Sequence, residues 1–232
     1  MKVTFIGLGI MGSRMAENLL ANDIELTVFN RSQSPMIELQ EKGADVSASA
    51  QQAVREADIV FTMLSTPEVV EEVVWSKDGF IAHMKKQALW VDCSTVNPSF
   101  SRQSKEVSNR HHIRFLDAPV AGSIPQAEKR DLVFFVGGAK DDVIEIEPLL
   151  KMMGNKVMHI GGIGMGTSYK LLVNAMLAQS MIAFAEAVLL GEKLGVSRDF
   201  LLDTLPHIGV IAPFTKAKAE VIREGTFEAL FP

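Results

Sequence analysis

The stretch Val3-Thr-Phe-Ile-Gly-Leu-Gly-Ile-Met-Gly12 joins four strand-forming residues directly to a Gly-x-Gly-x-x-Gly loop. A helical pattern at Ser13–Ala21 follows at once. In such a unit the first glycine allows a tight turn, the second lets a pyrophosphate approach the backbone, and the third lets helix pack against strand. The alternative is an ordinary glycine turn. Because strand, loop and helix all agree, the stretch predicts dinucleotide binding at a helix N-terminus.

Strand and helix patterns alternate after this unit. Short apolar runs typical of strands covered on both faces are Leu26–Phe29, Ile59–Leu64, Leu89–Val91, Ile113–Leu116, Leu132–Val136 and Val157–Ile160. Helical patterns occur at Pro35–Lys42, Ala50–Glu56, Glu68–Trp75 and Asp141–Met153. The alternation predicts an α/β fold with a doubly wound, mainly parallel sheet.

The glycine-rich stretch Gly161–Gly164 is the clearest break in the chain, and everything beyond it has helical character. We therefore predict a nucleotide-binding domain over residues 1–162 and an all-helical domain over residues 163–232. The expected helices cover 167–194, roughly 198–207, and 212–224. The residues from Glu224 to Pro232 resemble the lead-in to another element, so we expect the helical domain to be incomplete or to be covered by a partner chain.

The 167–194 segment contains no Pro and would form a helix of roughly 42 Å. Between Leu171 and Leu190 apolar residues leave almost no polar face, which predicts a helix buried nearly all round. Lys170 and Asn174 are four residues apart, so both project from one side of the helix.

Composition excludes several classes of protein. A net charge of −5 and a pI near 5.6 give no general attraction to nucleic acid or to anionic membranes. The one cysteine, Cys93, excludes an intrachain disulfide and, with no signal-sequence pattern before Val3, indicates a cytoplasmic protein. The long helix could span a bilayer by length, but four polar side chains interrupt it, so a protein core is predicted instead. The histidines show no metal-ligand spacing, and no metal site is predicted.

Asn30-Arg31-Ser32 stands at the end of the second strand, where an NAD enzyme usually places Asp or Glu for the ribose 2′-hydroxyl. No carboxylate is present here. Arg31 can pair with a 2′-phosphate, while Asn30 and Ser32 add hydrogen bonds. The alternative is that Arg31 is a solvated loop residue. The position favours NADP, with NAD as the second choice.

Four separated stretches together resemble the β-hydroxyacid dehydrogenase family, which includes 3-hydroxyisobutyrate dehydrogenases and glyoxylate or succinic semialdehyde reductases. They are Gly7–Asn18, Asp92-Cys-Ser-Thr95, Asp117-Ala-Pro-Val-Ala-Gly122, and Gly164–Asn174. The resemblance implies a Rossmann-type domain joined by a long helix to an all-α domain, in dimers or tetramers. It also implies reversible hydride transfer between NAD(P) and a small 3-hydroxyacid or its carbonyl counterpart.

The resemblance also assigns site residues. Lys170 corresponds to the catalytic lysine and Asn174 to an amide one turn later. The residues implied around the cofactor are Gly7, Gly9, Ile10, Met11, Gly12, Asn30, Arg31, Ser32, Leu64, Ser65 and Thr95. Those implied around a carboxylate-bearing substrate are Thr95, Ala121, Gly122, Ser123, Lys170 and Asn174. An ammonium at Lys170 would stabilise alkoxide charge and donate a proton, whereas an ordinary helical lysine would merely be solvated.

Two departures from the family pattern affect these assignments. Ala121 stands where the family has a serine, so one hydroxyl donor to the substrate is absent; Ser123 or backbone amides are the candidate replacements. A further C-terminal Lys-Asp-Leu helix of the family would lie beyond Pro232.

Alternative functions remain open at this point. Imine reductases share the architecture but usually carry Asp or Tyr at the position of Lys170. A 6-phosphogluconate dehydrogenase would be much longer. A non-catalytic NADP-binding or scaffold protein would fit Ala121, although such a protein has no need of Lys170 and Asn174. The leading prediction is an NADP-dependent 3-hydroxyacid dehydrogenase or short-chain aldehyde-acid reductase that binds neither nucleic acid nor membrane and forms a homo-oligomer.

Overall fold

A computed structural model of the chain describes residues 1–225, with the side chain of Ala217 outside the description. The chain forms two compact units, Met1–Lys170 and Leu171–Pro232. The division falls inside a long helix, whereas the patterns in the sequence place a boundary after Gly162.

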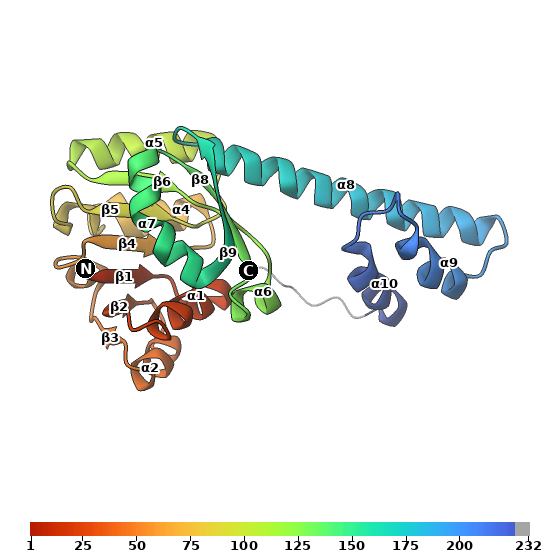
Figure 1. The fold of residues 1–232 in the computed structure, drawn as a ribbon, viewed down its shortest axis with the longest axis horizontal. Helices are drawn as coiled ribbons and strands as arrows, with labels where there is room; N and C mark the ends of the chain where they lie inside the picture. The colour runs from red at the N-terminus through yellow and green to blue at the C-terminus, as the bar shows by residue number, and fades with distance from the viewer. Residues whose placement is uncertain (226–232) are drawn as a thin grey trace. The chain divides into compact units, whose positions relative to one another are not determined.

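The first unit is built on a nine-stranded sheet of order β3-β2-β1-β4-β5-β6-β8-β7, with β9 beside β8 (Figure 1). The strands are β1 Val3–Ile6, β2 Leu26–Phe29, β3 Asp45–Val46, β4 Ile59–Thr62, β5 Leu89–Asp92, β6 Arg114–Asp117, β7 Val120–Ala121, β8 Leu132–Gly137 and β9 Gly154–Gly161. The six strands β1 to β6 are mutually parallel, and β8 runs antiparallel to β6 and β7. The predicted α/β class and Rossmann-type sheet are confirmed.

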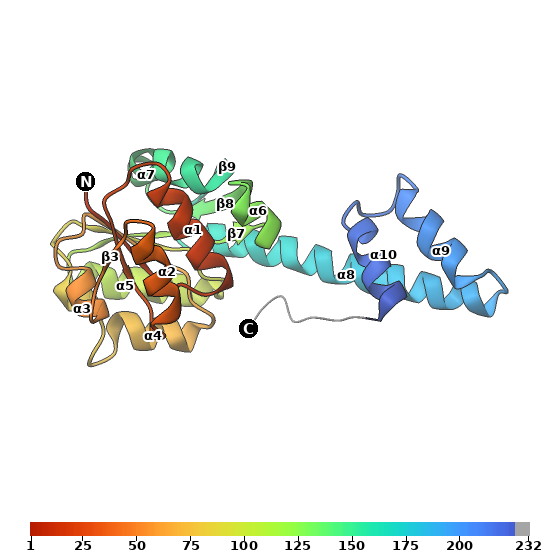
Figure 2. The ribbon, with the colours of Figure 1, turned by 90° about the horizontal axis from the view of Figure 1, so that it is seen from below.

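Helices cover both faces of this sheet (Figures 1 and 2). They are α1 Ile10–Leu20, α2 Ser34–Glu41, α3 Ala50–Ala53, α4 Pro67–Trp75, the 3-10 turn η1 Ile81–His83, α5 Pro98–Arg110, α6 Ile124–Glu128 and α7 Lys140–Met153. On one face α1, α2 and α7 pack over Phe5 and Phe61. On the other, α3, α4 and α5 pack over Trp90 and Phe115. Burial on both faces explains why the strand sequences are short apolar runs.

The second unit holds most of α8 (Met165–Lys193), then α9 (Arg198–Thr204), the 3-10 turn η2 (Leu205–His207) and α10 (Thr215–Glu224). Its buried apolar cluster consists of Phe184, Val188, Leu201, Leu202 and Ala219. Gly191 admits α9 closely, since a Cβ there would lie 2.6 Å from Leu201 Cδ1.

The prediction that α8 is buried nearly all round is wrong for the described residues. Leu172 is 64% exposed and Leu190 60% exposed. The short helices α9 and α10 offer too little surface to enclose a helix of 29 residues, so they cover one stripe of it. By length and composition alone, α8 is also the one helix among residues 1–225 that could cross a membrane.

Candidate cofactor and catalytic site

The predicted cofactor residues follow the carboxyl ends of four adjacent parallel strands. β2, β1, β4 and β5 are neighbours in this order, so their ends meet at one edge of the sheet (Figure 1). The order of the chain reverses between β1 and β4, and ligands of such sheets bind in the crevice at that point. Gly7, Asn30, Leu64 and Thr95 all lie just beyond these strand ends.

The glycine loop has the shape that a dinucleotide requires. A Cβ on Gly12 would lie 1.9 Å from Gly7 O, so close packing of α1 on the loop demands glycine there. Gly9, by contrast, has no atom within 4 Å of a built Cβ and has an ordinary backbone conformation, with φ −74°. The protein itself does not need glycine at that position. The open space beside this N-cap of α1 fits a pyrophosphate against free N–H groups.

The loop after β2 is held by Asn30. Asn30 Oδ1 accepts from Leu8 N at 3.0 Å, and its Nδ2 donates to Ser32 Oγ at 2.8 Å. Asn30 therefore ties this loop to the glycine loop, and the Ser32 hydroxyl oxygen accepts locally. Arg31 is exposed, and nothing within residues 1–225 pairs with its guanidinium. Of the three predicted ribose-phosphate residues, Arg31 has a free guanidinium and Ser32 a free hydroxyl proton within the described chain, while the amide of Asn30 is engaged.

A buried carboxylate organises the loops after β4 and β5. Asp92 Oδ1 accepts from Thr62 Oγ1 at 2.8 Å and from Ser94 N at 3.1 Å. The Ser94 hydroxyl accepts in turn from Leu64 N at 2.9 Å. Burial raises the pKa of Asp92 to about 6, against the hydrogen bonds that favour its charged form. These hydrogen bonds fix the backbone conformation of the loops that carry Ser65 and Thr95, whose side chains are exposed.

The role of Asp92 was not predicted, although it belongs to one of the quoted motifs. The signal available in the sequence is a carboxylate at the end of an otherwise apolar strand, two residues before a serine. A buried charge of this kind needs hydrogen-bond partners, and the sequence does not say which residues supply them.

The predicted substrate loop, Ala121 to Ser123, leads from β7 into α6. Gly122 has φ +123°, and a Cβ there would lie 2.7 Å from Leu132 Cδ2, so only glycine fits. Ser123 donates from both N and Oγ to Gln126 Oε1, at 3.0 and 3.2 Å. Its hydroxyl proton is therefore used at the start of α6, which leaves backbone amides as the more available donors.

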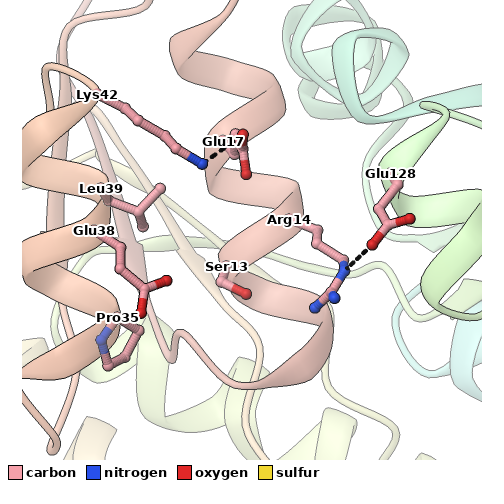
Figure 3. Close-up of a pocket in the computed structure, with 8 residues that line it drawn as sticks. All are labelled: Ser13, Arg14, Glu17, Pro35, Glu38, Leu39, Lys42 and Glu128. Atoms are coloured by element: carbon pink, nitrogen blue, oxygen red, sulfur yellow. Dashed lines mark hydrogen bonds and ion pairs between the residues drawn. The ribbon is translucent and has the colours of Figure 1, made fainter.

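Side chains that were not predicted connect this loop to the cofactor helix. Arg14 Nε on α1 lies 2.9 Å from Glu128 Oε1 on α6 (Figure 3). Asn18 Nδ2 on α1 also donates to Ala127 O at 2.7 Å. A surface pocket of about 330 Å³ lies between α1 and α2 beside Arg14. Its other charges are largely paired, as Lys42 is with Glu17 at 2.7 Å, so the pocket adds no second site.

Lys170 is half-buried in the second turn of α8, and burial lowers the pKa of its ammonium group. No hydrogen bond or ion pair joins it to any other residue of the described chain. An unpaired, partly desolvated ammonium is able to bind and protonate a developing oxyanion. Asn174 follows one turn later on the same helix, within the range of the second unit.

A doubly wound sheet with a glycine loop at its switch point defines a dinucleotide-binding domain. A family model described as the NAD-binding domain of 6-phosphogluconate dehydrogenase matches residues 2–161. The Arabidopsis thaliana glyoxylate/succinic semialdehyde reductase 1 is 34% identical over 232 residues, which are 100% of this chain and 80% of that protein. The mitochondrial 3-hydroxyisobutyrate dehydrogenase of Mus musculus is 37% identical over 204 residues, 88% of this chain and 61% of that one.

A solved structure of 3-hydroxyisobutyrate dehydrogenase from Mycobacterium tuberculosis with L-serine superposes with a TM-score of 0.83. It is 30% identical, with 99% of this chain and 89% of that chain covered. The chain belongs to the 3-hydroxyisobutyrate dehydrogenase family, a group of hydroxyacid dehydrogenase-type oxidoreductases. The match covers 64% of glyoxylate/succinic semialdehyde reductase 2 of Arabidopsis thaliana and 60% of a probable 3-hydroxyisobutyrate dehydrogenase of Dictyostelium discoideum.

Proposed function

We propose that this chain catalyses NADP(H)-dependent interconversion of a small 3-hydroxyacid and its aldehyde or keto-acid counterpart, with Lys170 as general acid and base. The observation that supports it most is the unpaired, half-buried ammonium of Lys170, three residues beyond Thr167, whose backbone N–H is anchored at the carboxyl end of β6. A lysine with a purely structural role would be expected to have a carboxylate partner or to extend into solvent.

The bound nicotinamide supplies or accepts the hydride. In reduction, the Lys170 ammonium stabilises the negative charge that develops on the carbonyl oxygen and then donates its proton. In oxidation, the neutral amine removes the proton from the hydroxyl group. Because burial lowers the pKa of Lys170, the neutral form is reached closer to neutral pH than for an exposed lysine. Asn174 adds a neutral amide for the substrate oxygen or the lysine.

Cofactor preference follows from the loop after β2. Asn30 takes the position of the usual carboxylate, and its Oδ1 already accepts from Leu8 N. Arg31 supplies the free guanidinium for a 2′-phosphate, which favours NADP over NAD. At the other end, the backbone amides of Gly122 and Ser123 suit a substrate carboxylate, since Ala121 offers no hydroxyl. Thr95, in the loop after β5, is the remaining proposed contact to the nicotinamide ribose and the substrate.

The exposed apolar surface of α8 supports a homo-oligomer, a dimer or a tetramer, in which another surface covers this helix. The single buried cysteine, Cys93, suits a reducing cytoplasm.

The test follows oxidation of NADPH and of NADH with a panel of short carbonyl acids that includes glyoxylate and succinic semialdehyde. Wild type is compared with Lys170→Ala and with Lys156→Ala, an exposed lysine on β9. The expected results are turnover with NADPH, a loss on the order of 10²- to 10⁴-fold in Lys170→Ala, and no change in Lys156→Ala. Tight NADPH binding without turnover would instead identify a non-catalytic binding protein. Undiminished turnover in Lys170→Ala would refute the acid–base role, and preference for NADH would refute the role of Arg31.

A further inference from the structure

A buried carboxylate from the sheet caps the helix that carries Lys170. Asp117, the last residue of β6, is 1% exposed. Its Oδ1 accepts from Gly164 N at 2.7 Å, and its Oδ2 accepts from Thr167 N at 2.8 Å and from Thr167 Oγ1 at 3.0 Å. These donors belong to the start of α8, where backbone N–H groups have no partner within the helix. A negative charge is also favourable at that end of the helix dipole.

Three further contacts hold the same turn. Ser101 Oγ on α5 lies 2.8 Å from Thr167 Oγ1, so the threonine hydroxyl bridges two elements. A Cβ on Gly166 would lie 2.3 Å from Phe135 O, which means that the backbone of α8 rests directly on β8. The rings of Tyr169 and Phe135 are 4.9 Å apart. The first turn of α8 is therefore fixed from β6, α5 and β8, immediately before Lys170.

We propose that Asp117 is a positioning residue for Lys170: by capping α8 it fixes the position of the lysine backbone relative to the carboxyl end of β6. The inference deepens the proposed function and rests on the acid–base role of Lys170. Lys170 is three residues beyond Thr167, so fraying of the capped turn would displace its backbone. A misplacement of about 1 Å in a reacting group can cost on the order of 100-fold in rate.

The charged groups around the first turn of α8 allow two possible actions of Asp117, by its charge or by its position, to be separated. The ionisable groups near this turn include Asp117 on β6, Asp92 on β5, Arg102 on α5 beside Gly164, His159 on β9, whose Nε2 lies 3.0 Å from Gly161 O, and Tyr169 on α8. None of them contributes to the pKa shift of Lys170, which burial alone lowers. If Asp117 acted by its charge, neutralising it would lower the lysine pKa further. If Asp117 acts by position, loosening the turn exposes Lys170 to water and raises that pKa.

The experiment compares Asp117→Asn with Thr167→Val, which keeps the Asp117 charge but removes one hydrogen bond to it. Thr167→Ser is the conservative variant that keeps the hydroxyl, and Asp141→Asn, at an exposed position on α7, is the matched control. Two quantities are measured: kcat and KM for each substrate, and the pH dependence of acetylation of Lys170 by acetic anhydride, read by peptide mass spectrometry against Lys156. The acetylation measurement needs no turnover, so it decides the positioning role even if the proposed reaction fails.

In Asp117→Asn and Thr167→Val we expect kcat to fall roughly 10- to 100-fold, with KM for NADPH nearly unchanged. The acetylation midpoint of Lys170 should rise toward that of Lys156 in both variants. Thr167→Ser and Asp141→Asn should behave as wild type. A midpoint that falls in Asp117→Asn and stays unchanged in Thr167→Val would overturn the proposal in favour of a charge effect. If Asp117→Asn does not fold, wild-type kcat and midpoint in Thr167→Val would overturn it equally.

Discussion

The second unit is richer in apolar residues than the first, but among the described residues it buries them less completely. In the first unit both faces of the sheet are covered, and large side chains such as Phe61 and Trp90 are fully enclosed. In the second unit the buried cluster is small. Its large exposed apolar side chains are Leu171, Leu172, Met176, Leu177, Ile182, Leu189, Leu190, Leu194, Val196, Phe200, Ile208 and Val210.

The difference follows from architecture. A sheet offers two broad faces, and each helix that crosses from strand to strand covers one of them. A long helix offers a surface all round, and two short helices can cover only part of it. The candidate cofactor loops, Lys170 and the Asp117 cap of α8 all lie in the first unit. The second unit contributes Asn174 and an apolar surface.

Matched leucine truncations should give the largest contrast. Leu19→Ala in α1 removes a fully buried side chain and should lower the free energy of unfolding by about 2–5 kcal/mol. Leu172→Ala in α8, where the side chain is 64% exposed, should cost no more than about 0.5 kcal/mol. Urea unfolding followed by tryptophan fluorescence reports the first unit, since Trp75 and Trp90 both lie there, and circular dichroism reports helices of both units. Equal losses would mean that Leu172 is buried in the working protein.

The buried Asp92 should make stability depend on pH in the direction opposite to most carboxylates. Its pKa is raised from 3.8 to about 6, so between these values the folded protein binds a proton that the unfolded chain has released. Stability from this group therefore falls as pH rises from about 4 to 6, by at most about 3 kcal/mol, and is constant above that range. Asp92→Asn should abolish this fall, as measured by urea unfolding at pH 4.5, 5.5 and 7.

Asp58 provides the control for that measurement. Hydrogen bonds from Lys2 and Lys85 lower the pKa of Asp58, so its contribution is present above its ordinary range and is lost on acidification. That loss occurs below about pH 4, so Asp58→Asn should leave the fall between pH 4.5 and 7 unchanged. If Asp92→Asn follows the wild-type curve throughout, Asp92 does not titrate in this range.

The sequence predicted most of this fold because the first unit obeys simple periodicities. Nearly every strand and helix of the βα alternation lies within a few residues of its expected place. α5 has no predicted counterpart, because three of its four buried residues are serines, Ser101, Ser104 and Ser108, and Phe100 alone gives no apolar periodicity. β3 and β7 are two residues each, too short to show a pattern. The extent of α8 was predicted, but its exposure depends on neighbours that composition does not reveal.

The residues of the candidate site also fall into those that the sequence reveals and those that it does not. The glycine loop, Arg31 and Lys170 carry local signals that a sequence displays directly. The networks that hold them join distant segments: Asp117 reaches Thr167 across 50 positions, and Thr62 reaches Asp92 across 30. Spacing along the chain gives no indication of such pairs, so the supporting residues emerge only from the structure.

Cofactor discrimination should be a property of the first unit alone. Arg31→Ala removes the free guanidinium beside Asn30 and should weaken NADPH binding about 10- to 100-fold, the effect of one charge-assisted hydrogen-bonded pair. NADH binding should not change, because NADH lacks the 2′-phosphate. Fluorescence titration of both cofactors checks this, with Arg55→Ala, an exposed arginine beyond α3, as the control. An equal loss for NADH would show that Arg31 shapes the loop and does not read the phosphate.

The smallest expected effect tests whether the two units unfold separately. Asn97 caps α5 in the first unit by accepting from Phe100 N at 2.8 Å, and Ser197 caps α9 in the second by accepting from Phe200 N at 3.3 Å. Truncating either cap to alanine should cost about 1 kcal/mol. Hydrogen exchange should locate the two losses differently: Asn97→Ala across the sheet and its helices, and Ser197→Ala in α9 and the end of α8 only. The small cluster around Phe184 and Leu201 has few contacts to lose, so it should open without the sheet. Reduced protection of the sheet strands in Ser197→Ala would show instead that α8 transmits stability along its length and unites both units into one cooperative structure.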